Sequence, residues 1–342
     1  MSLGVFVRRH VMGSQLAIDI GTCNTIVYVS GRGVIVEEPS VILVDRLTRR
    51  TISAGQAAFD LLGREPAGLE AISPVREGAV ADWDACKSLV SFLLQRSGRH
   101  LHLPHATAIA CVSSGATEVE RRALSAAVEA GAHRRVALLD QPWAAALGAG
   151  LAGTERDSGG VVVDIGGGTT EIGLVAAGSV VRERALRLGG NAMDYAVLHE
   201  VKSHLGLTIG ERTAERLKRT VGLEGTSTDM VEVAGVDPRG LGLRVEHIAT
   251  ERVSSALEPA VTAVIEAVRD VLADMPADLA EVIEKGTVWL SGGVSQMKGL
   301  AARLEKEIGL RTKLAPDPMR CVVRGATQLL EDGSARRRLR AA

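Results

Sequence analysis

The stretches Asp19-Ile20-Gly21-Thr22 and Asp164-Ile165-Gly166-Gly167-Gly168-Thr169 decide the fold of this chain. Each aspartate ends an apolar run rich in β-branched residues, and glycine and then threonine follow it. A second β-branched run begins directly afterwards, so each stretch predicts two strands joined by a tight turn. The two aspartates lie close to half a chain length apart in 342 residues, which indicates a duplicated design. We therefore expect two related halves that face each other across a cleft.

The two turns have the composition of phosphate-binding loops. Glycine admits backbone conformations that direct consecutive N–H groups into one concavity, where an anion can lie. Thr22, Thr25, Thr169 and Thr170 add hydroxyl donors. Asp19 and Asp164 would hold Mg²⁺ through its water ligands, because a carboxylate at the end of an apolar strand needs such a partner. Neither turn is a Walker loop or a Rossmann fingerprint, since no Gly-Lys-Ser/Thr follows and a strand succeeds the glycines.

Composition limits the classes of protein to consider. The chain has 40 basic and 41 acidic residues, which argues against a dedicated nucleic-acid binder. Its hydrophobic fraction is 46% with 2% aromatic residues, so the core must consist of Val, Ile, Leu and Ala. The four cysteines occur singly, which favours a reducing cytoplasm over a disulfide framework. No window is apolar enough for a membrane-spanning helix.

Strand and helix patterns alternate along both halves, which predicts an α/β architecture with mixed sheets. Helices are expected over residues 82–95, 117–131, 142–151, 193–205, 211–221, 250–275, 297–308 and 318–330. The polar, glycine-rich stretch 153–160 is the predicted domain boundary. A third glycine turn, Ser291-Gly-Gly-Val-Ser295, follows the expected strand 287–290 and is well placed to contact a base or ribose.

Several further segments carry a resemblance to one family. They are Asp19 to Tyr28, Glu38-Pro-Ser40, Gly78 to Asp82, Ser114 to Arg122, Pro142 to Gly150, Val163 to Glu171, Ile209 to Lys218 and Pro316 to Ala326. On these segments the chain resembles the MreB family of rod-shape-determining bacterial actins. This family falls within the actin, sugar-kinase and heat-shock-chaperone ATPase superfamily. The resemblance covers roughly residues 15–330, and the stretch Ile209 to Lys218 is its most diagnostic part.

The resemblance implies an actin-like fold of duplicated mixed-sheet domains, with four subdomains and a central cleft for ATP and Mg²⁺. Domain I would cover 15–152, with a subdomain at about 41–74. Domain II would cover 161–330, with a subdomain at about 191–250. An N-terminal segment, 1–14, and a basic tail, 331–342, would flank them.

The resemblance also implies roles for individual residues. Thr22, Cys23 and Asn24 would meet the nucleotide phosphates from one side, and Gly166, Gly167, Gly168 and Thr169 from the other. Glu215 and Lys218 would reach the ribose and base, with Gly292 and Gly293 under the adenosine. Asp140 and Gln141 would position the attacking water for slow hydrolysis, and Asp19 and Asp164 would form the Mg²⁺ side.

The chain departs from the family pattern at a few of these positions. Gln141 stands where a glutamate is usual, which puts the rate of hydrolysis in question. Val294 replaces a glycine near the adenosine, and its Cβ could loosen contact with the base. Asn191 and Ala192 replace an acidic pair, and Cys23 replaces an alanine. These departures suggest a divergent member.

Members of this family form filaments on the inner face of the cell membrane and organise cell-wall synthesis, so these partners and this location are implied here. Membrane contact would come from the N-terminal segment, which could equally be a frayed tail, or from Leu101 and Leu103, which could equally pack beneath their loop. Two alternatives remain open. One is a scaffold that binds nucleotide with little or no hydrolysis, and the other is a small-molecule kinase on the same fold.

Overall fold

The computed structural model describes residues 15–97, 108–151, 159–240 and 242–331. The chain divides into two compact units, 1–150 with 320–342 and 151–319. Among the described residues no helix is long and apolar enough to span a membrane. The predicted membrane contacts at residues 1–14, Leu101 and Leu103 lie outside the described residues, and so does the predicted basic tail 331–342 except its first residue.

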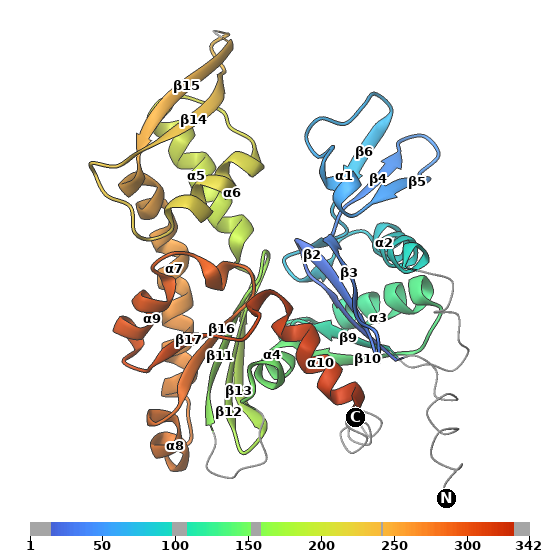
Figure 1. Ribbon diagram of the computed structural model, residues 1–342, viewed down its shortest axis with the longest axis vertical. Coiled ribbons are helices and arrows are strands. Elements are labelled where there is room, and N and C mark those ends of the chain that lie inside the picture. Colours follow the sequence, from blue (N-terminus) through green and yellow to red (C-terminus); the bar gives the residue numbers. More distant parts are fainter. Residues whose placement is uncertain (1–14, 98–107, 152–158, 241, 332–342) are drawn as a thin grey trace, which may run out of the picture. The chain divides into compact units, whose positions relative to one another are not determined.

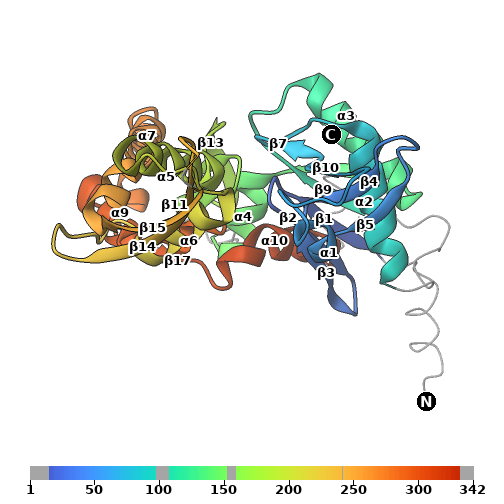
Figure 2. The same ribbon diagram turned by 90° about the horizontal axis from the view of Figure 1, so that it is seen from above.

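The first unit is built on a five-stranded mixed sheet with the order β10-β9-β1-β2-β3. The central strand β1 pairs antiparallel with β2 and parallel with β9, and β9 pairs parallel with β10. Helices α2 and α3 lie on one face of this sheet and α4 and α10 on the other (Figure 2). The bounds are β1 Leu16–Ile20, β2 Asn24–Val29, β3 Gly33–Pro39, β9 Ala108–Val112, β10 Val136–Asp140, α2 Trp83–Arg96, α3 Glu118–Ala132, α4 Gln141–Ala149 and α10 Cys321–Glu331.

Local sequence signals explain where two of these helices begin. Asp82 accepts a hydrogen bond from the amide of Ala85 and so starts α2. Thr117 and Glu120 form a reciprocal capping box at the start of α3, as the sequence predicts. Gly131 does not end α3: the helix continues to Ala132, and His133 forms the left-handed cap.

A small sheet with the order β5-β4-β6 follows the first hairpins, and its own apolar cluster contains Val41, Leu43 and Ala58. This sheet lies within the range predicted as a subdomain, 41–74. Two short strands then form a hairpin that leads into α2. The bounds are β4 Ile42–Asp45, β5 Thr51–Ala54, α1 Gln56–Phe59, β6 Leu69–Ile72, β7 Val75–Arg76 and β8 Ala79–Val80.

The second unit repeats the strand order of the first. Its sheet runs β13-β12-β11-β16-β17, with β11 antiparallel to β12 and parallel to β16. Strand β11 is therefore the counterpart of β1, and the predicted duplication is confirmed. The bounds are β11 Gly159–Ile165, β12 Thr170–Ala176, β13 Ser179–Leu186, β16 Thr287–Ser291 and β17 Thr312–Leu314.

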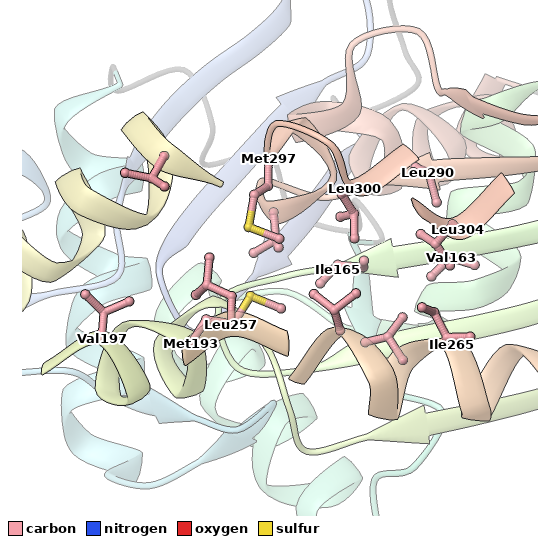
Figure 3. Close-up of a cluster of buried hydrophobic side chains, with 14 of the residues drawn as sticks. Val163, Ile165, Met193, Val197, Leu257, Ile265, Leu290, Met297, Leu300 and Leu304 are labelled. Carbon is pink, nitrogen blue, oxygen red and sulfur yellow. The ribbon is translucent and has the colours of Figure 1, made fainter. Parts of the chain in front are cut away.

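The core of the second unit lies between its sheet and its helices. Figure 3 shows Val163 and Ile165 of β11 among Met193, Leu257, Ile265 and Leu290, and all six side chains are buried. Figure 1 shows α7 beside this sheet and a long hairpin of β14 and β15 next to α5 and α6. The bounds are α5 Gly190–Leu205, α6 Glu211–Val221, β14 Met230–Asp237, β15 Gly242–Ala249, α7 Thr250–Ala273, α8 Ala280–Glu284 and α9 Leu300–Ile308.

Most boundaries lie within a few residues of the predicted ones, and the differences have local causes. The sequence predicts hairpin strands only over 231–233 and 243–245. Strands β14 and β15 are longer, because the backbone pairing continues from Met230↔Ala249 to Asp237↔Gly242. The stretch before α9 forms a separate short 3-10 helix, Val294–Gln296, and Gly299 with φ 78° breaks the helical path.

Helix α10 clusters with the first unit, whereas the sequence prediction grouped residues up to 330 with the second domain. The reason is a close crossing of α10 and α4. A Cβ on Gly325 would lie 1.8 Å from the carbonyl oxygen of Ala144, so only glycine fits there. The same unit holds the helix at both ends, because Arg320 bonds Glu37 of β3 at 3.0 Å and Tyr28 of β2 bonds Glu331 at 2.9 Å.

Candidate functional site

In the first unit, the candidate site is the hairpin that joins β1 to β2. The amide of Gly21 donates to the carbonyl of Asn24 at 2.9 Å, which closes the turn. Thr22 lies beside the β7–β8 turn, because its hydroxyl accepts from the amide of Gly78 at 3.3 Å. Since that hydroxyl acts as an acceptor, its own proton remains available to a ligand. Cys23 is exposed at the tip of the turn.

Asp19 is the last residue but one of β1 and is partly buried. The side-chain amide of Gln141, the first residue of α4, lies 3.5 Å from its Oδ1. The structure therefore brings together a predicted metal residue and a predicted catalytic residue within one unit. Asp140 has a different environment, because its carboxylate receives the guanidinium of Arg121 at 2.7 Å. Of the predicted catalytic pair, Gln141 adjoins the hairpin and Asp140 forms an ion pair with α3.

The equivalent hairpin of the second unit joins β11 to β12 and contains Gly166, Gly167 and Gly168. Its carbonyls point at the start of α5, where the amide of Gly190 donates to Gly166 at 3.0 Å and that of Asn191 to Gly167 at 2.8 Å. No backbone carbonyl in the described ranges accepts from the amides of Gly167 or Gly168. Those two N–H groups are thus donors that an anion could use.

Close packing around this hairpin requires glycine at two further positions. A Cβ on Gly189 would lie 2.6 Å from the carbonyl oxygen of Gly166. Gly292 has φ +81°, and its Cβ would lie 2.3 Å from the carbonyl oxygen of Ile165. The predicted third glycine turn therefore packs against the residue that precedes the hairpin, and Gly293 next to it is exposed.

Asp164 is the buried carboxylate of the second unit. Its side chain accepts a hydrogen bond of 2.6 Å from the hydroxyl of Ser291 on the adjacent parallel strand. Burial raises the pKa of Asp164 to about 6, and the Ser291 hydrogen bond opposes that rise only in part. A cation near this carboxylate would favour its charged form.

Lys218 is buried on α6, and two groups at the start of α5 surround its ammonium. Nζ lies 3.0 Å from the carbonyl oxygen of Gly190 and 2.9 Å from Oδ2 of Asp194. Burial raises the pKa of Asp194, and the charge of Lys218 opposes this. Glu215, one turn earlier on α6, is half-buried. Sequence reasoning did not assign Asp194 a role, although its spacing of four residues from Gly190 places it one turn into the helix.

Val294, which departs from the family pattern, is buried. Its side chain is 8% exposed and belongs to the apolar core of the second unit. A Cβ on Gly190 would meet it at 3.0 Å, so Val294 packs directly beneath the start of α5.

Sequence reasoning also missed two serines that hold the hairpins. Ser291 bonds Asp164, and Ser40 bonds the first hairpin from the end of β3. Ser40 directly follows β3, and Ser291 is the last residue of β16. Both lie in segments that the sequence singles out, Glu38-Pro-Ser40 and the third glycine turn, but the sequence does not show which groups they bond. Cys111 holds the position opposite Asp19 that Ser291 holds opposite Asp164.

Two α/β units of the same strand order, each with an Asp-Gly hairpin after its central strand, define an actin-like protein. MreB5 of Spiroplasma citri bound to ADP has the same fold, with a TM-score of 0.85 and 28% identity over 93% of this chain and 96% of that one. A subunit of the MamK double helical filament matches in fold with a TM-score of 0.78, at 21% identity over 93% of this chain and 99% of that one.

Sequence comparison identifies the family. The model of the MreB/Mbl protein family matches residues 13–338. The cell shape-determining protein MreB of Escherichia coli (strain K12) is 36% identical over 94% of this chain and 95% of its own length. The cell shape-determining protein Mbl of Bacillus subtilis (strain 168) is 30% identical over 93% and 96%. The chain belongs to the MreB/Mbl family, as the sequence motifs predict.

Proposed function

We propose that this protein binds ATP with Mg²⁺ and assembles into filaments that act in determining cell shape. The observation that carries the proposal is the pair of Asp-Gly hairpins, one after the central strand of each unit. The related MreB5 has been solved with ADP and with AMPPNP, and the AMPPNP form is 27% identical over 96% of this chain. Two relatives that align with this chain over nearly the full length of both proteins are named as cell shape-determining proteins.

The residues present fit a nucleotide. Turn amides at Gly167 and Gly168 provide donors for phosphate oxygens, and the hydroxyl and amides of Thr22, Cys23 and Asn24 provide the same chemistry in the first unit. Thr169 would add a hydroxyl. Asp19 and Asp164 would hold Mg²⁺ through its waters, and the metal would neutralise phosphate charge. Glu215 and Lys218 would meet the ribose and base, with Gly292 and Gly293 under the adenosine.

Slow hydrolysis would depend on Gln141. In-line attack on the γ-phosphate needs a group that orients water, and an uncharged amide can do this. Gln141 lies within 3.5 Å of Asp19, which supports its placement at the phosphate side of the first unit. Asp140 would act indirectly, because its bond to Arg121 fixes the strand end from which α4 begins.

Filaments at the inner face of the cell membrane, in contact with cell-wall synthesis proteins, complete the proposal. The segment 1–14 and the Leu101/Leu103 loop would supply the membrane contact. A second candidate is a nucleotide-binding scaffold with little hydrolysis, and the engagement of Asp140 by Arg121 favours it, because this carboxylate is then poorly suited to activate water.

Sedimentation and electron microscopy with ATP, ADP and AMPPNP on lipid vesicles test the proposal. We expect filaments that form with ATP or AMPPNP and bind the vesicles, with slow release of phosphate from ATP. Filaments without phosphate release would favour the scaffold. Monomers in every nucleotide state, with phosphate transferred to an added metabolite, would replace the filament proposal by the kinase.

A further inference from the structure

Ser40 is a fully buried polar residue directly after β3, and it makes three hydrogen bonds to or beside the first hairpin. Its amide donates to the carbonyl of Cys23 at 2.8 Å. Its hydroxyl donates to the carbonyl of Gly21 at 2.7 Å and lies 2.9 Å from the hydroxyl of Thr25. Ser40 thus contacts both ends of the turn that follows Asp19.

The direction of the hydroxyl bonds follows from proton counting. A serine hydroxyl has one proton, and that of Ser40 is given to Gly21. Thr25, which is also fully buried, must therefore donate to Ser40. The result is a directed chain from Thr25 through Ser40 to the Gly21 carbonyl, in which each bond polarises the next.

This chain orients the turn because the peptide group is planar and trans. In such a group the C=O and the N–H of the next residue point in opposite directions. Fixing the Gly21 carbonyl toward Ser40 directs the amide of Thr22 away from it, and fixing the Cys23 carbonyl does the same for Asn24. Ser40 therefore sets two of the peptide planes in the turn.

The second unit orients its hairpin by a different means. The carbonyls of Gly166 and Gly167 are fixed by backbone amides at the start of α5. No side chain takes part in those two bonds, so truncating a side chain does not remove them. In the first unit the carbonyl of Cys23 is fixed by the amide of Ser40, but that of Gly21 is fixed by the Ser40 hydroxyl. A point substitution of Ser40 can therefore remove the bond to Gly21.

We propose that Ser40 is the positioning residue for polyphosphate binding by the first hairpin, and that it confers preference for nucleoside di- and triphosphates over monophosphates. The inference rests on the proposed nucleotide function. Ser40 is fully buried, so it would not touch a ligand itself. It acts by holding the Thr22 and Asn24 amides toward the phosphate tail, whereas the adenosine would contact residues of the second unit.

The test is the affinity of Ser40→Ala for AMPPNP and for AMP, each with Mg²⁺, measured by titration calorimetry on the full chain. We expect AMPPNP to bind about tenfold more weakly than to wild type, which corresponds to about 1.4 kcal/mol. AMP affinity should change less than about twofold, because the adenosine contacts are unaltered. Ser40→Cys retains nearly the same volume but has a weak donor, so it should resemble Ser40→Ala. Ser40→Thr retains the hydroxyl and should bind AMPPNP almost as wild type does.

Two further variants separate positioning from stability. Ser254 also bonds a loop, accepting from Gly225 at 2.8 Å and donating to Gly222 at 2.9 Å, but in the second unit. Ser254→Ala should lower the melting temperature and leave the ratio of AMPPNP to AMP affinity unchanged. Should Ser40→Ala fail to fold, Thr25→Val removes the donor to Ser40 with little change of shape and should lower that ratio by about threefold.

Equal weakening of AMPPNP and AMP in the Ser40 variants, or none, would overturn the positioning role while leaving nucleotide binding intact. A wild-type chain that binds neither AMPPNP nor ADP would instead remove the proposed function, and the role of Ser40 with it.

Discussion

Ser291 donates a hydrogen bond of 2.6 Å to the buried carboxylate of Asp164 from the neighbouring parallel strand. The bond does not offset burial, since the pKa of Asp164 is still raised to about 6. The unliganded protein therefore holds a carboxyl that would be easier to ionise beside a cation. This couples the stability of the second unit to pH and to the ligand.

The first prediction concerns Asp164→Asn in the absence of nucleotide and Mg²⁺. Between the ordinary carboxyl pKa of about 4 and the raised value of about 6, the folded state keeps a proton that the unfolded state has released. The free energy of unfolding of wild type should therefore fall as pH rises through this window, by up to about 3 kcal/mol. The variant lacks this loss, so its stability relative to wild type should increase from pH 4.5 to pH 7 in urea denaturation.

Ser291→Ala provides the matched control for Asp164→Asn. It removes the hydrogen bond that lowers the pKa of Asp164, so the fall in stability should extend to higher pH than in wild type. Parallel pH profiles for wild type and both variants would contradict the assignment of Asp164 as the titrating group.

The second prediction is that Asp164→Asn loses the Mg²⁺ dependence of ATP binding. A neutral amide is a poor partner for hydrated Mg²⁺, so the affinity for ATP should fall at least roughly tenfold in Mg²⁺ and little in EDTA. Titration calorimetry with and without Mg²⁺ measures this. Unchanged affinity in Mg²⁺ would show that the metal does not depend on the second hairpin.

The sequence was sufficient to predict the duplicated sheets, because the alternation of β-branched strands and the Asp-Gly turns are local signals that recur in both halves. It also predicted the start of α3, where Thr117 and Glu120 form a standard cap. The membership of α10 was beyond local reasoning. Its placement depends on Gly325 approaching Ala144, a contact between residues far apart in the chain.

The candidate site divides in the same way. The glycines and aspartates of the two turns predict the hairpins, since few other residues suit such turns. The hydrogen bonds that orient the hairpins could not be predicted in this way, because a serine near the end of a strand is common. Only the three-dimensional structure shows that Ser40 bonds Gly21 and that Ser291 bonds Asp164. The ion pair of Asp140 with Arg121 was likewise hidden, because it joins a strand end to a helix face.

The third prediction concerns the buried pair of Lys218 and Asp194, whose side chains are 9% and 13% exposed. Lys218→Met leaves Asp194 without its cation and should lower the free energy of unfolding at pH 7 by about 3 kcal/mol. The loss should shrink at acidic pH, because protonation of Asp194 removes the unpaired charge. Urea denaturation at pH 5 and pH 7 gives the comparison.

The double variant Lys218→Met with Asp194→Leu separates structure from binding. It removes both charges, so most of the stability should return. If Lys218 also contacts the nucleotide, AMPPNP affinity should stay low in the double variant. Recovery of both properties together would make Lys218 a structural residue only.

The fourth prediction is that Gly325→Ala disrupts the crossing of α10 and α4. The added Cβ would lie 1.8 Å from the Ala144 carbonyl oxygen, so the helices must separate. We expect a loss of at least about 3 kcal/mol in the free energy of unfolding, beyond the usual cost of overpacking. Gly210→Ala is the control, because nothing lies within 4 Å of its added Cβ and its φ is −84°. That control should change stability by less than about 1 kcal/mol.

The last prediction concerns hydrolysis and rests on the bond between Gln141 and Asp19. Gln141→Ala should lower the rate of phosphate release from ATP by at least roughly tenfold, because the group that orients water is lost. The AMPPNP affinity of this variant should remain within about twofold of that of wild type, since the hairpin amides are untouched.

Gln141→Glu places a second carboxylate beside Asp19, where the two like charges repel each other. The stability of Gln141→Glu without Mg²⁺ should fall, and it should recover when Mg²⁺ and AMPPNP are added.

Arg121→Gln is the comparison for Asp140. If it slows phosphate release as much as Gln141→Ala does, at equal AMPPNP affinity, the Asp140 carboxylate contributes through its ion pair. Phosphate release that is undiminished in Gln141→Ala would remove Gln141 from the hydrolytic site.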